Sequence, residues 1–259
     1  MASAADVTSN RVIVITGAAS GIGLAAVHAM RQAGASIVGV DLASAPADLA
    51  NCADIEWISG DVAAQQTWDR VKAASLRRNP DGAHCLITCA ADVVVAPFLE
   101  TSPEEWRRLF DINVVGVIRA LQTLLPAMIA RGRGSVAVVC SINSFFAEDQ
   151  LSAYSASKAA LLHVVRSAAL EYARSGVRIN AVCPGAVDTP LLRRHLSSLD
   201  DPAAARHAIE QRTPTGKIVR PEEVAAVLRF AVSEEASGLS GASLIVDGGL
   251  TTAYDFDPP

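Results

Sequence analysis

The chain has little of what marks secreted, membrane-spanning or nucleic-acid-binding proteins. Residues 1–10 are small and polar, without the basic-then-apolar order of a secretory signal. No uninterrupted apolar run approaches the roughly 20 residues that cross a bilayer. The longest candidate, residues 83–99, is interrupted by His84, Asp92 and Pro97. The net charge of −5 argues against a nucleic-acid-binding surface. We therefore expect a cytoplasmic protein that binds neither membranes nor nucleic acid.

Cysteine and lysine are also scarce. The five cysteines are odd in number and lack metal-binding spacing, which predicts reduced thiols and no metal site. Only three lysines occur, at 72, 158 and 217, so a lysine at a regular distance from a tyrosine is informative. By contrast, 51% of the residues are hydrophobic. This content suffices for a large core and suggests an apolar surface at which copies of the chain associate.

Short β-branched runs alternate with longer amphipathic stretches. Strands separated by helix-length spacers predict βαβ units, and right-handed crossovers place helices on both faces of a parallel sheet. We therefore predict a single α/β domain over residues 1–259, doubly wound and of Rossmann type, with a substrate lid at about 188–213. The predicted strands cover residues 11–16, 36–41, 55–59, 85–88, 135–141, 177–183 and 243–246, and the predicted helices cover residues 21–33, 64–77, 102–130 and 152–173, with a further helix starting at Pro221.

A glycine-rich turn follows the first predicted strand. Small residues let the backbone approach a pyrophosphate, and the next helix offers free N–H groups at its N-terminus. The spacing is G-x-x-x-G-x-G, so the motif alone is also compatible with an ordinary tight turn. In this strand–turn–helix context it predicts dinucleotide binding by Gly17, Ser20, Gly21, Ile22 and Gly23.

Carboxylates end the second and third predicted strands. Asp41 stands where it would accept hydrogen bonds from the adenosine ribose and repel a 2′-phosphate, which favours NAD over NADP. Asp61 would accept a hydrogen bond from the adenine amino group, with Val62 as an apolar wall.

Tyr154 and Lys158 are four residues apart in a predicted helix and therefore share one face. An isolated phenol titrates near pH 10, and a neighbouring ammonium stabilises its phenolate. Tyr154 can then exchange a proton with an alcohol or a ketone as hydride moves. A surface tyrosine beside a solvated lysine is the alternative.

With these motifs in place, residues 12–249 resemble the shorter, single-domain branch of the short-chain dehydrogenase/reductase family. The resemblance implies that Ser141 hydrogen-bonds the substrate oxygen and that the backbone of Asn113 holds a water beside Lys158. It further implies a dimer or tetramer, and we expect a homotetramer. The segment around the nicotinamide would comprise Pro184, Gly185, Val187 and Thr189.

One motif departs from the family. Thr88-Cys89-Ala90-Ala91 stands where Asn-Asn-Ala-Gly is usual. We still expect Cys89, Ala90 and Ala91 to contact the cofactor, but the missing amides remove hydrogen bonds that brace the central strand. Cofactor affinity and local stability are therefore in question.

The expected substrate is a small cyclic or aliphatic secondary alcohol or its ketone. By analogy it would lie between Asn143, Ser144, Phe145, Phe146 and Leu151 on one side and Leu191, Leu192 and His195 on the other. A separate hypothesis places Cys89, Cys140 and Cys183 at the ligand-binding strand ends, the alternative being that all three fill the core.

The sequence thus predicts an NAD-dependent alcohol dehydrogenase or carbonyl reductase. Epimerases and dehydratases also use a tyrosine and a lysine on a Rossmann sheet, but they carry a larger substrate domain and other glycine spacing. A catalytically idle dinucleotide sensor is the remaining alternative, kept open by the altered 88–91 motif.

Overall fold

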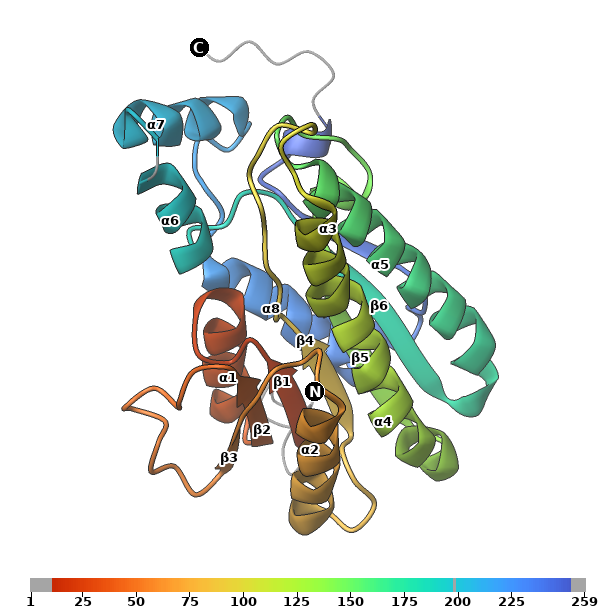
Figure 1. Cartoon of the computed structure of the whole chain (residues 1–259). Helices are drawn as coiled ribbons and strands as arrows, with labels where there is room; N and C mark the ends of the chain where they lie inside the picture. The colour runs from red at the N-terminus through yellow and green to blue at the C-terminus, as the bar shows by residue number, and fades with distance from the viewer. Residues whose placement is uncertain (1–10, 198, 253–259) are drawn as a thin grey trace.

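A single parallel sheet organises the chain in the computed structural model, which describes residues 11–197 and 199–252 (Figure 1). The strand order is β3-β2-β1-β4-β5-β6-β7, so the direction of winding reverses between β1 and β4. This is the doubly wound Rossmann-type arrangement that the sequence predicts. The strands are β1 (Val12–Thr16), β2 (Ser36–Asp41), β3 (Ile55–Ser59), β4 (Cys85–Thr88), β5 (Gly134–Val139), β6 (Val177–Pro184) and β7 (Ser243–Val246).

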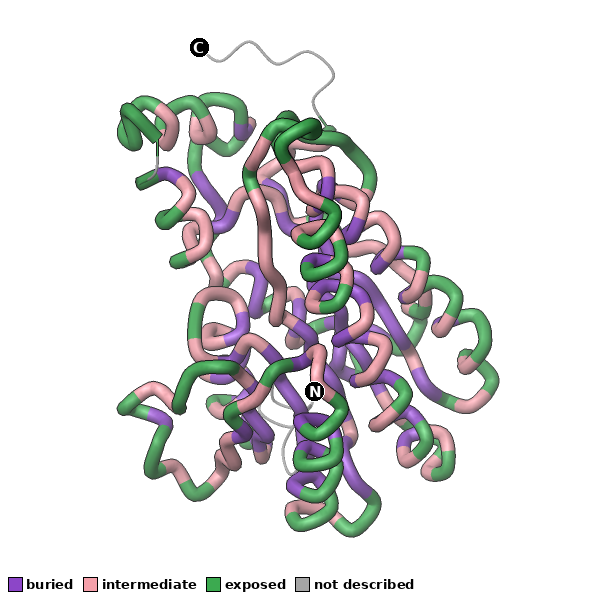
Figure 2. Tube along the Cα trace, viewed as in Figure 1, coloured by how far each residue is buried: buried purple, intermediate pink, exposed green. Residues whose placement is uncertain are grey.

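Helices cover both faces, and each face has its own apolar core. On one face, Met30 of α1 (Gly21–Gln32) and Leu228 of α8 (Pro221–Val232) belong to the same cluster as Ile13 of β1. On the other face, α2 (Gln65–Arg78), α4 (Gly116–Arg131) and α5 (Ser152–Tyr172) pack through Trp68, Leu124 and Leu161. Figure 2 shows the central strands buried and the outer helix faces exposed. Burial on both faces explains why the strands are nearly continuous apolar runs.

The helix predicted over 102–130 begins as expected and contains an irregularity that the sequence analysis missed. Ser102 caps α3 (Pro103–Phe110) in a capping box: its hydroxyl accepts from Glu105 N at 3.2 Å, and its own N–H donates to the Glu105 carboxylate at 2.8 Å. One π-helical turn, η2 (Asp111–Val115), then joins α3 to α4. Isolated π turns inside helices often accompany functional sites.

Residues 103–131 are also the longest apolar helical stretch, not residues 83–99. By length and composition this stretch could cross a membrane, but half of its most apolar window is buried. Leu109, Val117 and Leu124 are at most 5% exposed. We therefore assign it to the core of the fold.

Two helices stand outside the sheet layers, at the carboxyl ends of the strands (Figure 1). They are α6 (Pro190–Ser197) and α7 (Pro202–Arg212), within the segment predicted as a substrate lid at about 188–213. Asp188 accepts hydrogen bonds from Arg193 at 2.8 Å and from Arg206 at 3.4 Å, so a single carboxylate joins both helices to the end of β6. The short helical turns are η3 (Ile142–Ser144), η4 (Ala173–Ser175), η5 (Glu234–Ala236) and η6 (Leu250–Thr252).

Candidate active site

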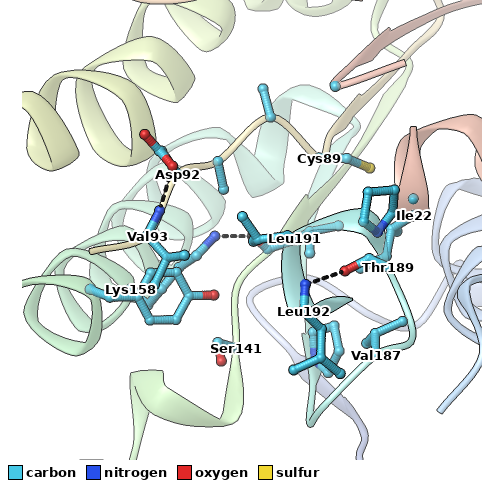
Figure 3. Close-up of a pocket in the computed structure, with 18 of the residues that line it drawn as sticks. Ile22, Cys89, Asp92, Val93, Ser141, Lys158, Val187, Thr189, Leu191 and Leu192 are labelled. Carbon is cyan, nitrogen blue, oxygen red and sulfur yellow. Dashed lines mark hydrogen bonds between the residues drawn. The ribbon is translucent and has the colours of Figure 1, made fainter. Parts of the chain in front are cut away.

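A cavity of about 740 Å³ lies at the carboxyl ends of the strands, beside β1 and β4, between which the direction of winding reverses. Ligands bind at this position in open α/β sheets. Figure 3 shows Lys158 and Asp92 on one side of the cavity and Ile22 and Thr189 on the other. All residues predicted to bind the cofactor line it, although they come from six separate segments: Gly17, Ser20, Gly21, Ile22, Gly23, Asp41, Asp61, Val62, Cys89, Ala90, Ala91, Tyr154, Lys158, Pro184, Gly185, Val187 and Thr189.

The glycines of the first turn are required by its geometry. A Cβ on Gly23 would lie 2.0 Å from the Gly17 carbonyl oxygen, and a Cβ on Gly17 would lie 2.7 Å from Ala90 N. Gly17 also has a φ of +65°, a conformation in which a side chain is strained. The turn is therefore compact, and it presents backbone with no side chain at the start of α1. This cradle fits the phosphates of a dinucleotide.

Asp41 is fixed by the same turn. Its carboxylate accepts hydrogen bonds from Ala19 N and Ala43 N, both at 3.0 Å, at the carboxyl end of β2. Leu42 beside it is 75% exposed, and no lysine or arginine lines this end of the cavity among the described residues. Asp61 and Val62 continue the same wall, and Asp61 accepts from Ala63 N at 2.8 Å. This end of the cavity therefore carries negative charge.

Tyr154 and Lys158 share one face of α5 and both line the cavity. Lys158 is only 2% exposed, and its Nζ donates to the Val139 carbonyl oxygen at 2.9 Å. Its ammonium lies 5.7 Å from the centre of the Tyr154 ring. Because Lys158 has only this one protein hydrogen bond among the described residues, two of its donors remain for ligand or solvent. This arrangement excludes the solvated surface lysine that was the alternative.

Ser141 lies just past the end of β5 and lines the cavity beside Asn143. Its hydroxyl lies 3.2 Å from Asn143 Oδ1, to which it donates, and accepts from Asn143 N at 3.1 Å. Asn143 Nδ2 in turn donates to Glu148 at 3.1 Å and to Ser155 at 3.3 Å. Glu148 was not anticipated from the sequence, because its place in the cavity depends on these bonds across the loop.

Asn113 does not line the cavity but lies behind it, fully buried in the π turn. Its side-chain oxygen accepts from Asp92 N at 2.9 Å. Its Nδ2 donates to the Asp92 carbonyl oxygen at 2.9 Å and to Ser157 Oγ at 3.0 Å. Asn113 therefore connects the loop after β4 to the α5 turn that carries Tyr154 and Lys158.

These bonds show how the altered 88–91 motif is braced. Thr16 Oγ1 accepts from Cys89 N at 3.1 Å and from Ala90 N at 3.2 Å. With Asn113 holding Asp92, the loop keeps its backbone hydrogen bonds without the usual asparagine amides. Thr88 contributes none, because its buried hydroxyl has no partner among the described residues.

The three strand-end cysteines divide between cavity and core. Cys89 and Cys140 line the cavity, whereas Cys183 does not. Desolvation raises the pKa of the Cys89 thiol to about 12, against a smaller opposing effect of the Lys158 charge. Cys140 and Cys183 lie on neighbouring strand ends, and their mutual hydrogen bond, followed by burial, raises the pKa of Cys183. The same hydrogen bond lowers the pKa of Cys140, against the opposing effect of burial, so the shared proton of this pair lies with Cys183.

The residues predicted to contact substrate are only partly brought together. Ser144, Phe145 and Phe146 are not among the lining residues; Ser144 Oγ instead donates to the Lys158 carbonyl oxygen, and the phenylalanines are exposed. Five do line the cavity: Asn143, Leu151, Leu191, Leu192 and His195. Other residues line the cavity without having been predicted from the sequence, among them Glu148, Arg194, Ile209, Arg212 and Leu250.

No group of three or more histidine, cysteine, aspartate or glutamate side chains within residues 11–197 and 199–252 is placed to hold a metal ion.

Comparison with known proteins places this geometry in a family. Residues 17–251 match a family described as enoyl-(acyl carrier protein) reductase. Cis-4-hydroxycyclohexanecarboxylate dehydrogenase of Sinomonas cyclohexanicum is 38% identical, over 94% of this chain and 97% of its own. Meso-2,3-butanediol dehydrogenase of Serratia marcescens is 32% identical, over 94% and 96%. Among solved structures, levodione reductase superposes with a TM-score of 0.90 at 27% identity, covering 95% of this chain and 100% of that one.

The chain has a Rossmann-type fold and is an oxidoreductase of the short-chain dehydrogenase/reductase family. Its similar relatives include dehydrogenases that act on small alcohols.

Proposed function

We propose that this protein is an NAD(H)-dependent dehydrogenase that interconverts a secondary alcohol and a ketone, with Tyr154 as acid and base. The observation that carries the proposal is the convergence of Tyr154, buried Lys158 and Ser141 on the same cavity as the glycine turn. A dinucleotide cradle alone would serve a sensor. A phenol, an ammonium and a hydroxyl gathered beside it favour chemistry.

The residues divide the chemistry as follows. A dinucleotide held in this cavity would supply hydride chemistry at the carbon that bears the substrate oxygen. In the oxidation, Tyr154 accepts the hydroxyl proton at the substrate oxygen while Ser141 donates a hydrogen bond to that oxygen. The Lys158 ammonium would stabilise the phenolate form of Tyr154, which accepts this proton. Asn113 acts indirectly, by fixing the α5 turn through Ser157.

The cofactor would lie with its pyrophosphate over Gly17–Gly23 and its adenosine between Asp41, Asp61 and Val62. The nicotinamide ring would lie against Pro184, Gly185, Val187 and Thr189. Cys89, Ala90 and Ala91 would lie along the ribose that carries this ring. We propose NAD because the Asp41 carboxylate, at the end of β2, would accept hydrogen bonds from ribose hydroxyls and would repel a 2′-phosphate.

The substrate would be a small cyclic or aliphatic secondary alcohol. The wall near Ser141 and Tyr154 is largely apolar, with Leu151, Leu191 and Leu192. The relatives described above act, by name, on a hydroxycyclohexane carboxylate and on a butanediol, which are secondary alcohols of this size. We further propose that α6 and α7 form a lid over the substrate, that the protein is cytoplasmic and that it self-associates, as a tetramer.

Reduced-nicotinamide absorbance with NAD, across secondary alcohols, polyols and cyclic hydroxy acids, tests the proposal. We expect turnover that falls at least about 10³-fold in Tyr154→Phe, with unchanged NADH affinity by fluorescence titration. Tyr172→Phe, the same change at the far end of α5 and outside the cavity, is the matched control and should retain activity within a few-fold. NADH binding without turnover of any alcohol or ketone would favour the idle sensor.

A further inference from the structure

Two arginines line the cavity, and nothing proposed so far uses them. Arg194 lies on α6 and Arg212 at the end of α7. On α6, Arg194 and His195 follow Leu191 by three and four residues, so the three side chains lie on one face of the helix. All three line the cavity. Arg193, one residue away, points elsewhere and pairs with Asp188 at 2.8 Å. The lid therefore separates its arginines by role: Arg193 and Arg206 hold the lid, and Arg194 and Arg212 face the cavity.

The two cavity arginines also lack a counter-charge. Within the described residues, neither forms an ion pair with a carboxylate, whereas Arg193 and Arg206 both do. Arginine binds planar oxyanions through a fork of N–H donors, and two such side chains from different helices can hold one carboxylate or sulfonate. Unpaired guanidinium groups lining a cavity are thus a ready site for an anionic group.

Acidic residues that line the cavity near Ser141 would orient such a ligand. Glu148 lines the cavity next to the Ser141 side and is held there by Asn143 at 3.1 Å. The remaining acid on this side, Asp92, is neutralised by contact with Arg108. A ligand with an anionic end would be repelled by Glu148 and attracted toward α6 and α7. Its uncharged, alcohol-bearing end would then lie toward Ser141 and Tyr154.

We propose that the substrate of this protein is an anionic secondary alcohol, a hydroxy acid or sulfonate on a small ring or chain, whose anion binds Arg194 and Arg212. The proposal rests on the proposed dehydrogenase function and names the substrate class of that same site. It assigns the two arginines to specificity, because they touch the substrate away from the reacting carbon.

The decisive experiment uses an unreactive pair of ligands, so that binding does not depend on turnover. Cyclohexanecarboxylate and cyclohexanecarboxamide are similar in shape and differ in charge. Their affinities for the full-length protein saturated with NADH are measured by calorimetry, for the wild type, Arg194→Met/Arg212→Met and the control Arg174→Met. Arg174→Met removes the same charge from an exposed position on η4, outside the cavity and away from α6 and α7.

We expect the wild type and Arg174→Met to bind the carboxylate at least about tenfold more tightly than the carboxamide, and the preference to weaken in high salt. In the double variant the two affinities should become equal, with unchanged NADH affinity and carboxamide binding. Equal affinities in the wild type would overturn the proposal. So would a loss of NADH affinity in the double variant, because the arginines would then serve the cofactor phosphates.

A turnover assay separates this proposal from the one on which it rests. If the carboxylate preference is present but no cyclic hydroxy acid is oxidised, the dehydrogenase proposal fails while the anion site stands. If neutral alcohols are oxidised as efficiently as their carboxylate analogues, the dehydrogenase stands and the anion site is overturned.

Discussion

At the residue scale, two threonines that pair across β1 and β4 have opposite surroundings. Thr16 and Thr88 are register partners and are both buried. Thr16 Oγ1 accepts two backbone N–H groups from the loop after β4, whereas Thr88 Oγ1 has no partner among the described residues. A buried hydroxyl without a partner destabilises the fold, and a buried acceptor with two donors stabilises it.

Thr88→Val should therefore raise the free energy of unfolding by about 1 kcal/mol, and Thr16→Val should lower it by about 1–3 kcal/mol. Urea unfolding followed by circular dichroism measures both. The two changes are chemically identical and lie side by side, so each is the control for the other. Equal destabilisation by both would show that Thr88 has a hydrogen-bond partner.

Also at this scale, we expect the Asp41 carboxylate to determine which cofactor is preferred. Asp41→Asn keeps an acceptor for Ala19 N or Ala43 N but removes the charge. We expect the ratio of kcat/KM with NADP to that with NAD to rise at least about tenfold, which corresponds to about 1.4 kcal/mol. Asp61→Asn, at the adenine end, should leave this ratio unchanged. A wild-type preference for NADP would contradict the role given to Asp41.

At the scale of elements, the attachment of α6 and α7 to the end of β6 depends on one acid, Asp188. Hydrogen bonding to Arg193, with a smaller effect from Arg206 and against the opposing effect of desolvation, lowers the pKa of Asp188. A carboxyl whose pKa is lowered on folding contributes stability above its unfolded pKa, and this contribution is lost as the pH falls through the lowered, folded value. The attachment of α6 and α7 should therefore be constant at neutral pH and weaken below about pH 4.

Asp188→Asn should loosen the attachment at neutral pH. We expect faster amide hydrogen exchange within 190–212 and unchanged protection of the central strands. Asp201→Asn provides the matched control, because Asp201 caps only α7, through Ala204 N at 2.9 Å. Exchange that is equally fast in both variants would mean that Asp188 does not join the two helices to β6.

At the scale of the whole molecule, several large apolar side chains are exposed, which supports the proposed self-association. Leu170 on α5 is 82% exposed, and Phe230 on α8 and Ile245 on β7 are 38% and 48% exposed. Large exposed apolar side chains on outer helices and on the last strand are typical of surfaces covered by another subunit.

We therefore expect light scattering after size-exclusion chromatography to give about four times the 27.0 kDa chain mass. Leu170→Glu should lower this mass, because it places a charge in a desolvated contact. Leu42→Glu, at a position 75% exposed beside Asp41, is the control and should leave the mass unchanged. A monomeric wild type would contradict the proposed assembly.

The sequence by itself determined the architecture and the pieces of the site. Alternating apolar runs and amphipathic stretches predicted the ends of the seven strands and of the main helices to within one or two residues. This is possible because the spacing of apolar residues along the chain reflects which side of each element is buried. The glycine turn, Asp41 and the Tyr154–Lys158 spacing are local motifs, and a local motif can be recognised without the fold.

Only the tertiary structure decided what depends on contacts between distant segments. The π turn at Asp111–Val115 has no sequence signal, and neither do the bond from Asn113 to Ser157 or the placement of Glu148 through Asn143. Arg193 and Arg194 are the same residue type in adjacent positions. Their different surroundings follow from the angle at which α6 meets the cavity, which the packing of the whole chain sets.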